Sequence, residues 1–397
     1  MTSNADETRL HAALDAFELE LPSWGFSNTG TRFRVFPQAG TPRNAHEKID
    51  DVATVHRYTG AAPRVSLHIP WDRVEDMAQL AQYAQAHGVS IGGINANTFQ
   101  DEDYRLGSLG HPSNTVRQKA MEHMRVCVDV MEQTSSSVLK IWLGDGTNYP
   151  GQDDFRARKR RLQDGLREVH DMLPDDATML VEYKLYEPAL YHTDIQDWGM
   201  ALLFCRFAGD RARVVVDLGH HAQGVNIEQI VAVLLDEERL GAFDLNDRKY
   251  GDDDLMAGSI NPYQLFLIFH ELVSAEHASN ADGVARCARR VKYMVDQAHN
   301  IEAKVPAMIR TVTTLQEHWL KAQLVDREAL AAAQVSGEIV AANDLLKDAY
   351  DTDVRSVVSR WREARGLPSD PVRAYLASGE VEQRRRERAE GVAAGWG

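Results

Sequence analysis

Short apolar runs rich in β-branched and aromatic residues recur along the chain, and longer amphipathic segments separate them. Runs of this length and composition are typical of buried β-strands. The pattern predicts eight strands: Trp24–Ser27, Val65–Ile69, Val89–Asn95, Val138–Leu143, Met179–Leu185, Val214–Leu218, Phe243–Asn246 and Tyr293–Asp296.

The segments between the runs have the apolar spacing of helices. Examples are RVEDMAQLAQYAQAHG, TVRQKAMEHMRVCVDVMEQT and FRARKRRLQDGLREVHDML, and several of these segments end in glycine or a polar turn. Strands that alternate with helices indicate βα units and a parallel sheet. A doubly wound open sheet usually carries a glycine-rich GxGxxG loop after its first strand, and this chain has none. Eight units therefore favour an α/β fold of the (β/α)8 TIM barrel type.

The two ends of the chain are predicted to be helical. We expect an N-terminal helix within residues 1–20, a barrel domain over residues 1–300, and a C-terminal α-helical extension over residues 301–397. The extension has apolar faces but too few residues for a core of its own, so we expect it to pack against another subunit. Its last stretch, EVEQRRRERAEG, is predicted to be a solvated, frayed helix end.

Composition narrows the possible partners and the compartment. The chain has 397 residues and a formal net charge of -15, which argues against a nucleic-acid partner. Cys127, Cys205 and Cys287 form no CxxC pair and lie in apolar segments, so we expect buried free thiols in a reducing compartment. The start of the chain is unlike a signal peptide, and no apolar stretch approaches the roughly 20 residues that span a bilayer. We therefore expect no membrane contact and a cytoplasmic location.

Carboxylates inside the later predicted strands are the first candidate for chemistry. Four consecutive strands each carry one: Glu182, Asp217, Asp244 and Asp296. A lone buried carboxylate is usually a satisfied ion pair, but four at neighbouring strand ends would repel one another. Either their pKa values rise or cations neutralise them, and oxygen ligands select hard or borderline divalent ions. The strand ends of a TIM barrel are also where its chemistry is located.

A second group of metal-ligand residue types follows the same strands. Asp217 is followed by His220, and the GDDD segment supplies Asp252 and Asp254 at a D-x-D spacing. By itself, GDDD is more often a solvated loop. Next to a strand-end carboxylate site, the group suits an ion that keeps open positions for substrate or water. If Asp217 bridges both groups, the site holds two metal ions.

Further residues suit a polyol substrate. Lys184 lies two residues after Glu182 and so shares its strand face. His68, Trp71 and Trp142 are predicted near the ends of two other strands. Indole rings can stack on the apolar face of a sugar, although core packing is an equally good explanation for each tryptophan alone.

These residues together resemble the L-rhamnose isomerases of the type found in Pseudomonas and Gram-positive bacteria. The likeness covers nearly the whole chain, and the broader xylose isomerase-like barrels share its metal scheme. It is carried by Glu182-x-Lys184, Asp217-x-x-His220, the NDRKYGDDD segment and Asp296, and by GTPRNAHEKIDD, HIPWD, GTNYPGQ and WREARGLPSDP. One position departs, because L-rhamnose isomerases commonly carry histidine where this chain has Asp244, whereas xylose isomerases carry aspartate there.

The resemblance implies an intramolecular oxidoreductase that interconverts an aldose and a ketose, L-rhamnose and L-rhamnulose, by transfer of hydrogen between C1 and C2. It implies two divalent cations per subunit, with Mn²⁺ first and Co²⁺, Mg²⁺ or Zn²⁺ as alternatives. One ion would be held by Glu182, Asp217, Asp244 and Asp296, and the other by Asp217, His220, Asp252 and Asp254.

The resemblance also implies roles for individual side chains. Lys184 would polarise the carbonyl oxygen, His68 would assist ring opening, and Asp296 is a candidate base if the route passes through an enediol. The substrate would contact Trp71, Trp142, Phe33, Glu182 and His220. Phe33 matches an aromatic residue that covers a neighbouring subunit's pocket, and the expected assembly is a homotetramer or homodimer.

Other functions stay open on the sequence. An isomerase of another aldose fits the same residues. A ketose 3-epimerase typically holds one metal between two glutamates, which the Asp252/Asp254 pair argues against. An endonuclease on this barrel would need more histidine ligands and a basic groove. A metal-stabilised assembly protein would not explain why Lys184 and His68 converge on one barrel mouth.

Overall fold

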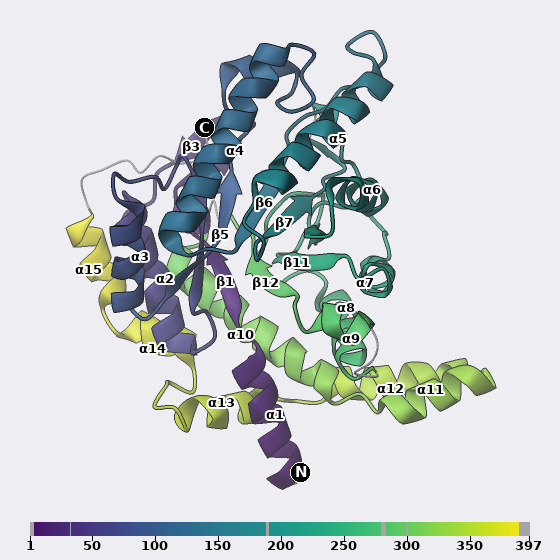
Figure 1. Ribbon diagram of the computed structural model, residues 1–397. Helices are drawn as coiled ribbons and strands as arrows, with labels where there is room; N and C mark the ends of the chain where they lie inside the picture. Colours follow the sequence, from purple (N-terminus) through teal and green to yellow (C-terminus); the bar gives the residue numbers. More distant parts are fainter. Residues whose placement is uncertain (1–3, 32, 188–189, 279–282, 299–300, 389–397) are drawn as a thin grey trace.

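The computed structural model describes residues 4–31, 33–187, 190–278, 283–298 and 301–388. Its centre is a closed barrel of eight parallel strands in the order β1-β12-β11-β10-β7-β6-β5-β4, which confirms the predicted TIM barrel (Figure 1). The strands are β1 (Leu19–Pro22), β4 (Arg64–Ile69), β5 (Ser90–Ala96), β6 (Val138–Trp142), β7 (Thr178–Glu182), β10 (Ala212–Asp217), β11 (Leu240–Leu245) and β12 (Lys292–Val295).

The prediction for the first strand was wrong. The strand is β1, whereas Trp24–Phe26 forms a 3-10 helix just after it. Leu19 and Leu21 are fully buried, and Glu20 between them accepts a hydrogen bond from Ser66. The alternation that defines this strand is therefore hidden by one interior carboxylate. The N-terminal helix α1 (Asn4–Ala16) ends before residue 20, because β1 begins at Leu19.

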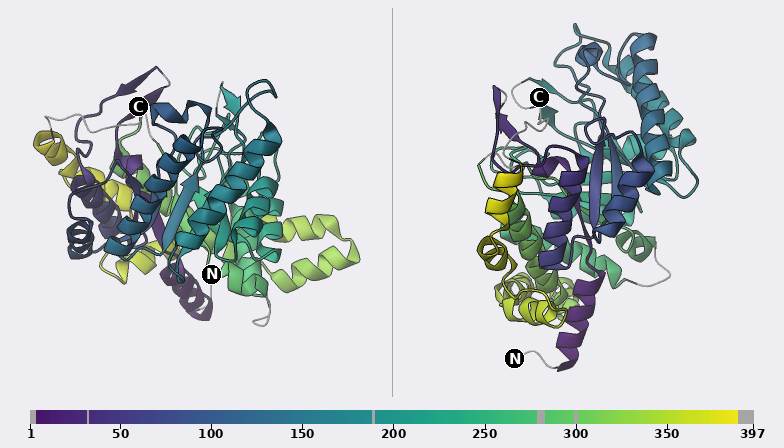
Figure 2. Two further views of the ribbon diagram at one scale, coloured as in Figure 1. Left: turned by 45° about the horizontal axis from the view of Figure 1, so that its top comes forward. Right: turned by 90° about the vertical axis from the view of Figure 1, so that its left-hand side faces the viewer.

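A ring of helices covers the outside of the barrel (Figure 2). Most of these helices begin with an Asn or Asp whose side chain accepts a backbone N–H of the first turn, for example Asn44, Asp154 and Asp197. In chain order they are α2 (Ala45–Thr59), α3 (Met77–Ala86), α4 (Asn114–Thr134), α5 (Phe155–Met172), α6 (Trp198–Ala208), α7 (Ile227–Asp236), α8 (Pro262–Glu276) and α10 (Lys304–Gln323), with the short α9 (Gly283–Ala288) before β12.

The interior of the barrel is layered. Val138, Leu180, Val215, Ala242 and Met294 form an apolar cluster inside it. Two residues further along each of these strands stand charged side chains. Because side chains on one face of a strand recur every second residue, the apolar cluster is the floor beneath that charged layer.

The helices after β12 pack largely on their own barrel. α10 contacts α8 and α2 and so takes the place of the eighth barrel helix, although it begins after residue 300. α13 (Arg355–Glu363) buries Val357, Val358 and Trp361 against α1 and α10. α14 (Pro371–Ala377) contacts both α10 and α2. The division into a domain of residues 1–300 and an extension of residues 301–397 stays a prediction.

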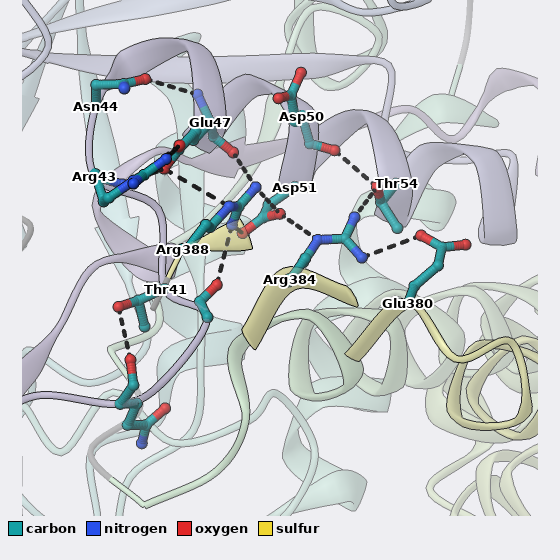
Figure 3. Close-up of polar contacts among 12 residues, drawn as sticks. Thr41, Arg43, Asn44, Glu47, Asp50, Asp51, Thr54, Glu380, Arg384 and Arg388 are labelled. Atoms are coloured by element: carbon teal, nitrogen blue, oxygen red, sulfur yellow. Dashed lines mark hydrogen bonds and ion pairs between the residues drawn. The ribbon is translucent and has the colours of Figure 1, made fainter. Parts of the chain in front are cut away.

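The charged helix α15 (Glu380–Glu387) is attached to the barrel by a pair of arginines, which we call the C-terminal clasp (Figure 3). Arg384 and Arg388 both donate to the carboxylate of Asp51 on α2, at distances from 2.8 to 3.0 Å. Arg388 also donates to the backbone oxygen of Gly40 at 3.1 Å. The prediction of a frayed end was therefore wrong for residues 380–388, whereas a solvated helix is confirmed for α15, in which no residue is buried. Residues 389–391 lie outside the described residues.

One part of the tail stands away from the barrel. α11 (Arg327–Ser336) and α12 (Ile339–Asp351) form a helical hairpin that projects from the body of the molecule (Figure 1). Val335 at its tip is 91% exposed. The expected contact of the extension with another subunit stays a prediction.

Two smaller expectations concern the cysteines and the membrane. Cys127, Cys205 and Cys287 are buried and unpaired, as predicted. In the described part of the chain, no helix is both long enough and apolar enough to cross a membrane.

Candidate active site

A cavity of about 560 Å³ opens where the barrel strands end. It brings together nine of the residues singled out from the sequence. These are His68, Trp71, Trp142, Glu182, Lys184, His220, Asp252, Asp254 and Asp296. Five further residues line it that the sequence analysis did not name as site residues: Trp24, Asn95, Ala96, Phe99 and Lys140.

Two predicted site residues, Asp217 and Asp244, lie in the barrel core beside this cavity. Both are buried, with 0% and 1% of their surface exposed. Ligand atoms of Glu182, Asp217, Asp244 and Asp296 all lie within 4.8 Å of one another. The four strand-end carboxylates thus form one cluster, as their positions predicted, and we call them the carboxylate cluster.

The carboxylate cluster is held in place by donors around it. Asn246 donates to both oxygens of Asp217, at 3.0 and 3.2 Å, and the backbone of Gly219 donates to one of them at 2.7 Å. Trp24 donates its indole N–H to Asp296 at 2.7 Å. These contacts fix the orientation of Asp217 and Asp296. Lone pairs of the carboxylate oxygens that accept no hydrogen bond are left for a ligand.

A buried lysine stands in the same cluster. Lys140 on β6 forms an ion pair with Asp244, and its Nζ lies 3.1 Å from Oε2 of Glu182. Burial opposes the charge, but Asp244, Glu182 and Asp296 together hold the pKa of Lys140 well above its ordinary value. Lys140 carried the same signal as Glu182, a charged residue inside an apolar strand, and the search for carboxylates passed over it.

The acids differ in how readily they ionise. Burial raises the pKa of Asp217 to about 7, and repulsion from Glu182 and Asp296 adds to the effect. Burial likewise raises the pKa of Asp296 to about 7. For Glu182 the charges of Lys140 and His220 outweigh burial and lower its pKa to about 2. Bound protons therefore neutralise part of the negative charge of the metal-free cluster near neutral pH.

His220 connects the carboxylate cluster to the GDDD loop. Its Nε2 lies 2.9 Å from Asp252 and 4.0 Å from Asp217, while its Nδ1 lies 3.0 Å from the backbone oxygen of Tyr183. Burial opposes a charge on this ring, but Asp217, Asp252 and Glu182 together raise the pKa of His220 well above its ordinary value. A metal ion that replaced the Nε2 proton would leave Nδ1 as the donor to Tyr183. His220 also groups with Glu182 and Asp217 as a possible metal-holding set.

The GDDD loop is a fixed turn. Asp253 accepts backbone N–H groups of Lys249, Tyr250 and Gly251, which closes the loop on itself. Asp252 and Asp254 adopt positive φ angles of 60° and 48°, a conformation that residues other than glycine rarely adopt. This backbone turns both side chains to the cavity, so the interpretation of GDDD as a solvated loop is not supported.

Lys184 contacts one carboxylate oxygen of Asp252, whereas His220 contacts the other. The Nζ of Lys184 is 2.6 Å from Asp252 and 3.0 Å from Glu187 of β8 (Tyr186–Glu187), which pairs with β9 (Tyr191–His192). Burial opposes the charge, but both acids raise the pKa of Lys184 above its ordinary value. The side chain is therefore a fixed positive charge at neutral pH.

The remaining wall of the cavity is aromatic. The rings of His68 and Trp71 stack at 3.9 Å, and Phe99 contacts both Trp71 and Trp142 edge-on. Burial, reinforced by the charges of Lys140 and Lys48, lowers the pKa of His68 well below its ordinary value, so the ring is neutral. Its Nδ1 is buried and has no hydrogen-bond partner among the described residues. The cavity thus has an acidic half and an aromatic half.

Phe33 is the one predicted site residue that lies neither in the cavity lining nor in the carboxylate cluster. It lies in the turn between β2 (Thr29–Thr31) and β3 (Arg34–Phe36), and 82% of its surface is exposed.

The donor set fits a divalent cation. Buried carboxylate oxygens and one imidazole nitrogen are ligands of Mg²⁺, Mn²⁺ and related ions. Oδ1 of Asp244 is buried and has no hydrogen-bond partner among the described residues, so that oxygen is left for an ion.

Fold and site together define a class: a TIM barrel with a carboxylate-rich cavity at its strand ends, where a group of acids could hold a metal ion. Residues 54–304 match the family model of the xylose isomerase-like TIM barrels. The chain belongs to that family.

Relatives with known names extend the comparison. The chain is 41% identical over 380 residues to a protein of Rhizobium meliloti (strain 1021) named "Probable sugar isomerase", a match that spans 94% of this chain and 87% of the relative. A protein of the same description from Mesorhizobium japonicum is 42% identical over 375 residues, with 93% and 86% covered. Among solved structures, the 3-keto-D-glucoside 4-epimerase of E. coli matches with a TM-score of 0.55 and 11% identity, and covers 76% of this chain and 99% of the epimerase. That last likeness shows the fold alone.

Proposed function

We propose that this protein is a divalent-metal-dependent sugar isomerase that interconverts an aldose and its ketose, with L-rhamnose and L-rhamnulose as the pair. The observation that carries the proposal is the cavity that joins the carboxylate cluster, the Lys184 ammonium and an aromatic wall. The two relatives named as sugar isomerases support the reaction class. L-rhamnose itself rests on the resemblance of the motifs.

We assign two divalent ions to the site, and Mn²⁺ is the first choice. Glu182, Asp217, Asp244 and Asp296 are the proposed ligands of one ion, and Asp217, His220, Asp252 and Asp254 those of the other. When bound, the ions supply Lewis acidity and fix adjacent oxygens of the open-chain sugar. The chemistry below is what the side chains of this chain contribute.

The two halves of the cavity orient the sugar. Hydroxyl groups face the acidic half, where Glu182 and His220 lie, and the carbon skeleton lies on Trp71, Phe99 and Trp142. A 6-deoxy sugar presents a methyl group that suits this aromatic wall. A single methyl group changes discrimination by only about 1–3 kcal/mol, so other aldoses are expected as slower substrates.

Two basic side chains act at the reacting end. His68 is neutral and buried, so it can take up or release a proton at the ring oxygen when the sugar opens. Lys184 is charged and held by Asp252 and Glu187, so it stabilises negative charge on the carbonyl oxygen rather than acting as a base. Hydrogen then passes between C1 and C2 as a hydride. Asp296 would be the base if an enediol formed instead.

We further propose that the assembly is a homotetramer in which Phe33 covers the pocket of a neighbouring subunit. Its 82% exposure on a short hairpin supports this placement.

The test is a panel of aldoses assayed after complete chelation and after addition of Mn²⁺, Co²⁺ or Mg²⁺. The proposal expects no turnover without metal and the highest kcat/KM for L-rhamnose, with L-rhamnulose as product. A Glu182→Gln variant that keeps its circular dichroism spectrum but loses activity would separate an enzyme from a structural protein. A product epimerised at C3 would replace the isomerase with a ketose 3-epimerase, and full activity of the chelated enzyme would refute the metal requirement.

A further inference from the structure

A buried cation is already built into the carboxylate cluster. The ammonium of Lys140 is paired with Asp244 and lies 3.1 Å from Glu182, and only 3% of the residue is exposed. It also lies 6.0 Å from the centre of the Trp24 ring, and Trp24 in turn donates to Asp296. Lys140 therefore touches the cluster directly, through Asp244 and Glu182.

Lys140 places a positive charge among the proposed ligands of one ion. It lies against Asp244 and Glu182, whereas Lys184 lies against Glu187 and against Asp252, a proposed ligand of the other ion. An ion bound beside Lys140 would share Asp244 and Glu182 with its ammonium.

We propose, on the basis of the function proposed above, that Lys140 is a positioning residue that acts as a fixed counter-cation of Asp244. It holds Asp244 and Glu182 in the carboxylate cluster before an ion binds, and it weakens divalent-ion binding there because its charge opposes the ion at short range.

The experiment is a double-mutant cycle on the full chain, stripped of metal, with Lys140→Met, Asp244→His and the double variant. Binding of Mn²⁺ is measured from the electron paramagnetic resonance signal of the free ion, and thermal unfolding is measured without metal. No sugar is needed, so the readout does not depend on activity.

Lys140→Met should unfold at a lower temperature without metal and bind Mn²⁺ at least about tenfold more tightly, because one opposing charge is gone. Asp244→His should bind Mn²⁺ at least about tenfold more weakly, because it loses a carboxylate and leaves Lys140 in place. The double variant should return to within about threefold of the unaltered chain, since its net charge is restored.

The inference would be overturned if Lys140→Met changed neither the affinity nor the metal-free unfolding temperature, or if the double variant bound Mn²⁺ as weakly as Asp244→His alone. If Lys140→Met does not fold without metal, it should fold when Mn²⁺ is added. If it does not fold even with Mn²⁺, the Mn²⁺ affinities of Asp244→His and of the double variant are compared instead. If the unaltered chain bound no Mn²⁺, the proposed function would fall together with this inference. Tight binding that is insensitive to Lys140 would refute this inference alone.

Discussion

The pKa of Asp217 makes the stability of the metal-free protein depend on pH in an unusual direction. Burial raises this pKa from 3.8 to about 7, so the folded protein binds a proton that the unfolded chain releases. Stability from this group is present at low pH and is lost as the pH rises through 7. Most buried carboxylates in ion pairs have the opposite effect.

The size of the effect follows from the shift. Near pH 6 the carboxyl of Asp217 is about nine-tenths protonated in the folded protein, and near pH 8 it is about nine-tenths ionised, whereas in the unfolded chain it is ionised at both values. Proton linkage then lowers the free energy of unfolding by about 1.4 kcal/mol over this interval. Asp296, with a similar pKa, adds to the same trend.

The assay is urea unfolding, followed by far-UV circular dichroism, of chelated protein near pH 6 and near pH 8. Asp217→Asn is the matched control, because an amide of the same shape cannot ionise. Between pH 6 and pH 8 the free energy of unfolding of the unaltered protein should fall by about 1.4 kcal/mol more than that of the variant. Saturating Mn²⁺ should abolish this difference. Equal pH dependence of the two chelated proteins would refute the reasoning.

Three further predictions concern other buried contacts and the route of hydrogen. Asp72 lies 2.6 Å from the buried ammonium of Lys48. Asp72→Asn removes the counter-charge of this ammonium, so the free energy of unfolding measured in urea should fall by about 3–5 kcal/mol. Adding Lys48→Met to Asp72→Asn should recover part of the lost stability. Arg388→Met removes two hydrogen bonds to buried Asp51 and should lower stability by about 1–3 kcal/mol, and an unchanged urea midpoint would contradict the C-terminal clasp. L-rhamnose tritiated at C2 should keep its label during turnover, whereas release of tritium to water would show proton transfer by a base such as Asp296.

The positions of the strands could be predicted because each is a compact apolar run. Seven of the eight were placed within a few residues, and β1 was displaced because LELP carries an interior glutamate while the neighbouring WGFS carries no charge. The repeat of strand and helix, rather than any single run, indicated the barrel. The local pattern of apolar residues therefore predicted the architecture more accurately than it predicted the position of the first strand.

The carboxylates of the site could also be predicted, since each interrupts an apolar strand or follows its end. The counter-charge was missed, because the prediction considered Lys184 alone, although the predicted barrel places β6 next to β7 and Lys140 is a charged residue inside an apolar strand, as Glu182 is. Contacts between residues far apart in the chain could not be predicted. Nothing in EVEQRRRERAEG reveals that Arg384 and Arg388 meet Asp51, more than 300 positions earlier.

The most direct test of the central claim is a crystal structure of the full chain grown with Mn²⁺, with diffraction recorded at the manganese absorption edge. The account predicts anomalous peaks at the strand ends, one among Glu182, Asp217, Asp244 and Asp296 and one beside His220 and Asp252. If this region held no anomalous peak at saturating Mn²⁺, the acids would have another purpose and the proposed chemistry would be wrong.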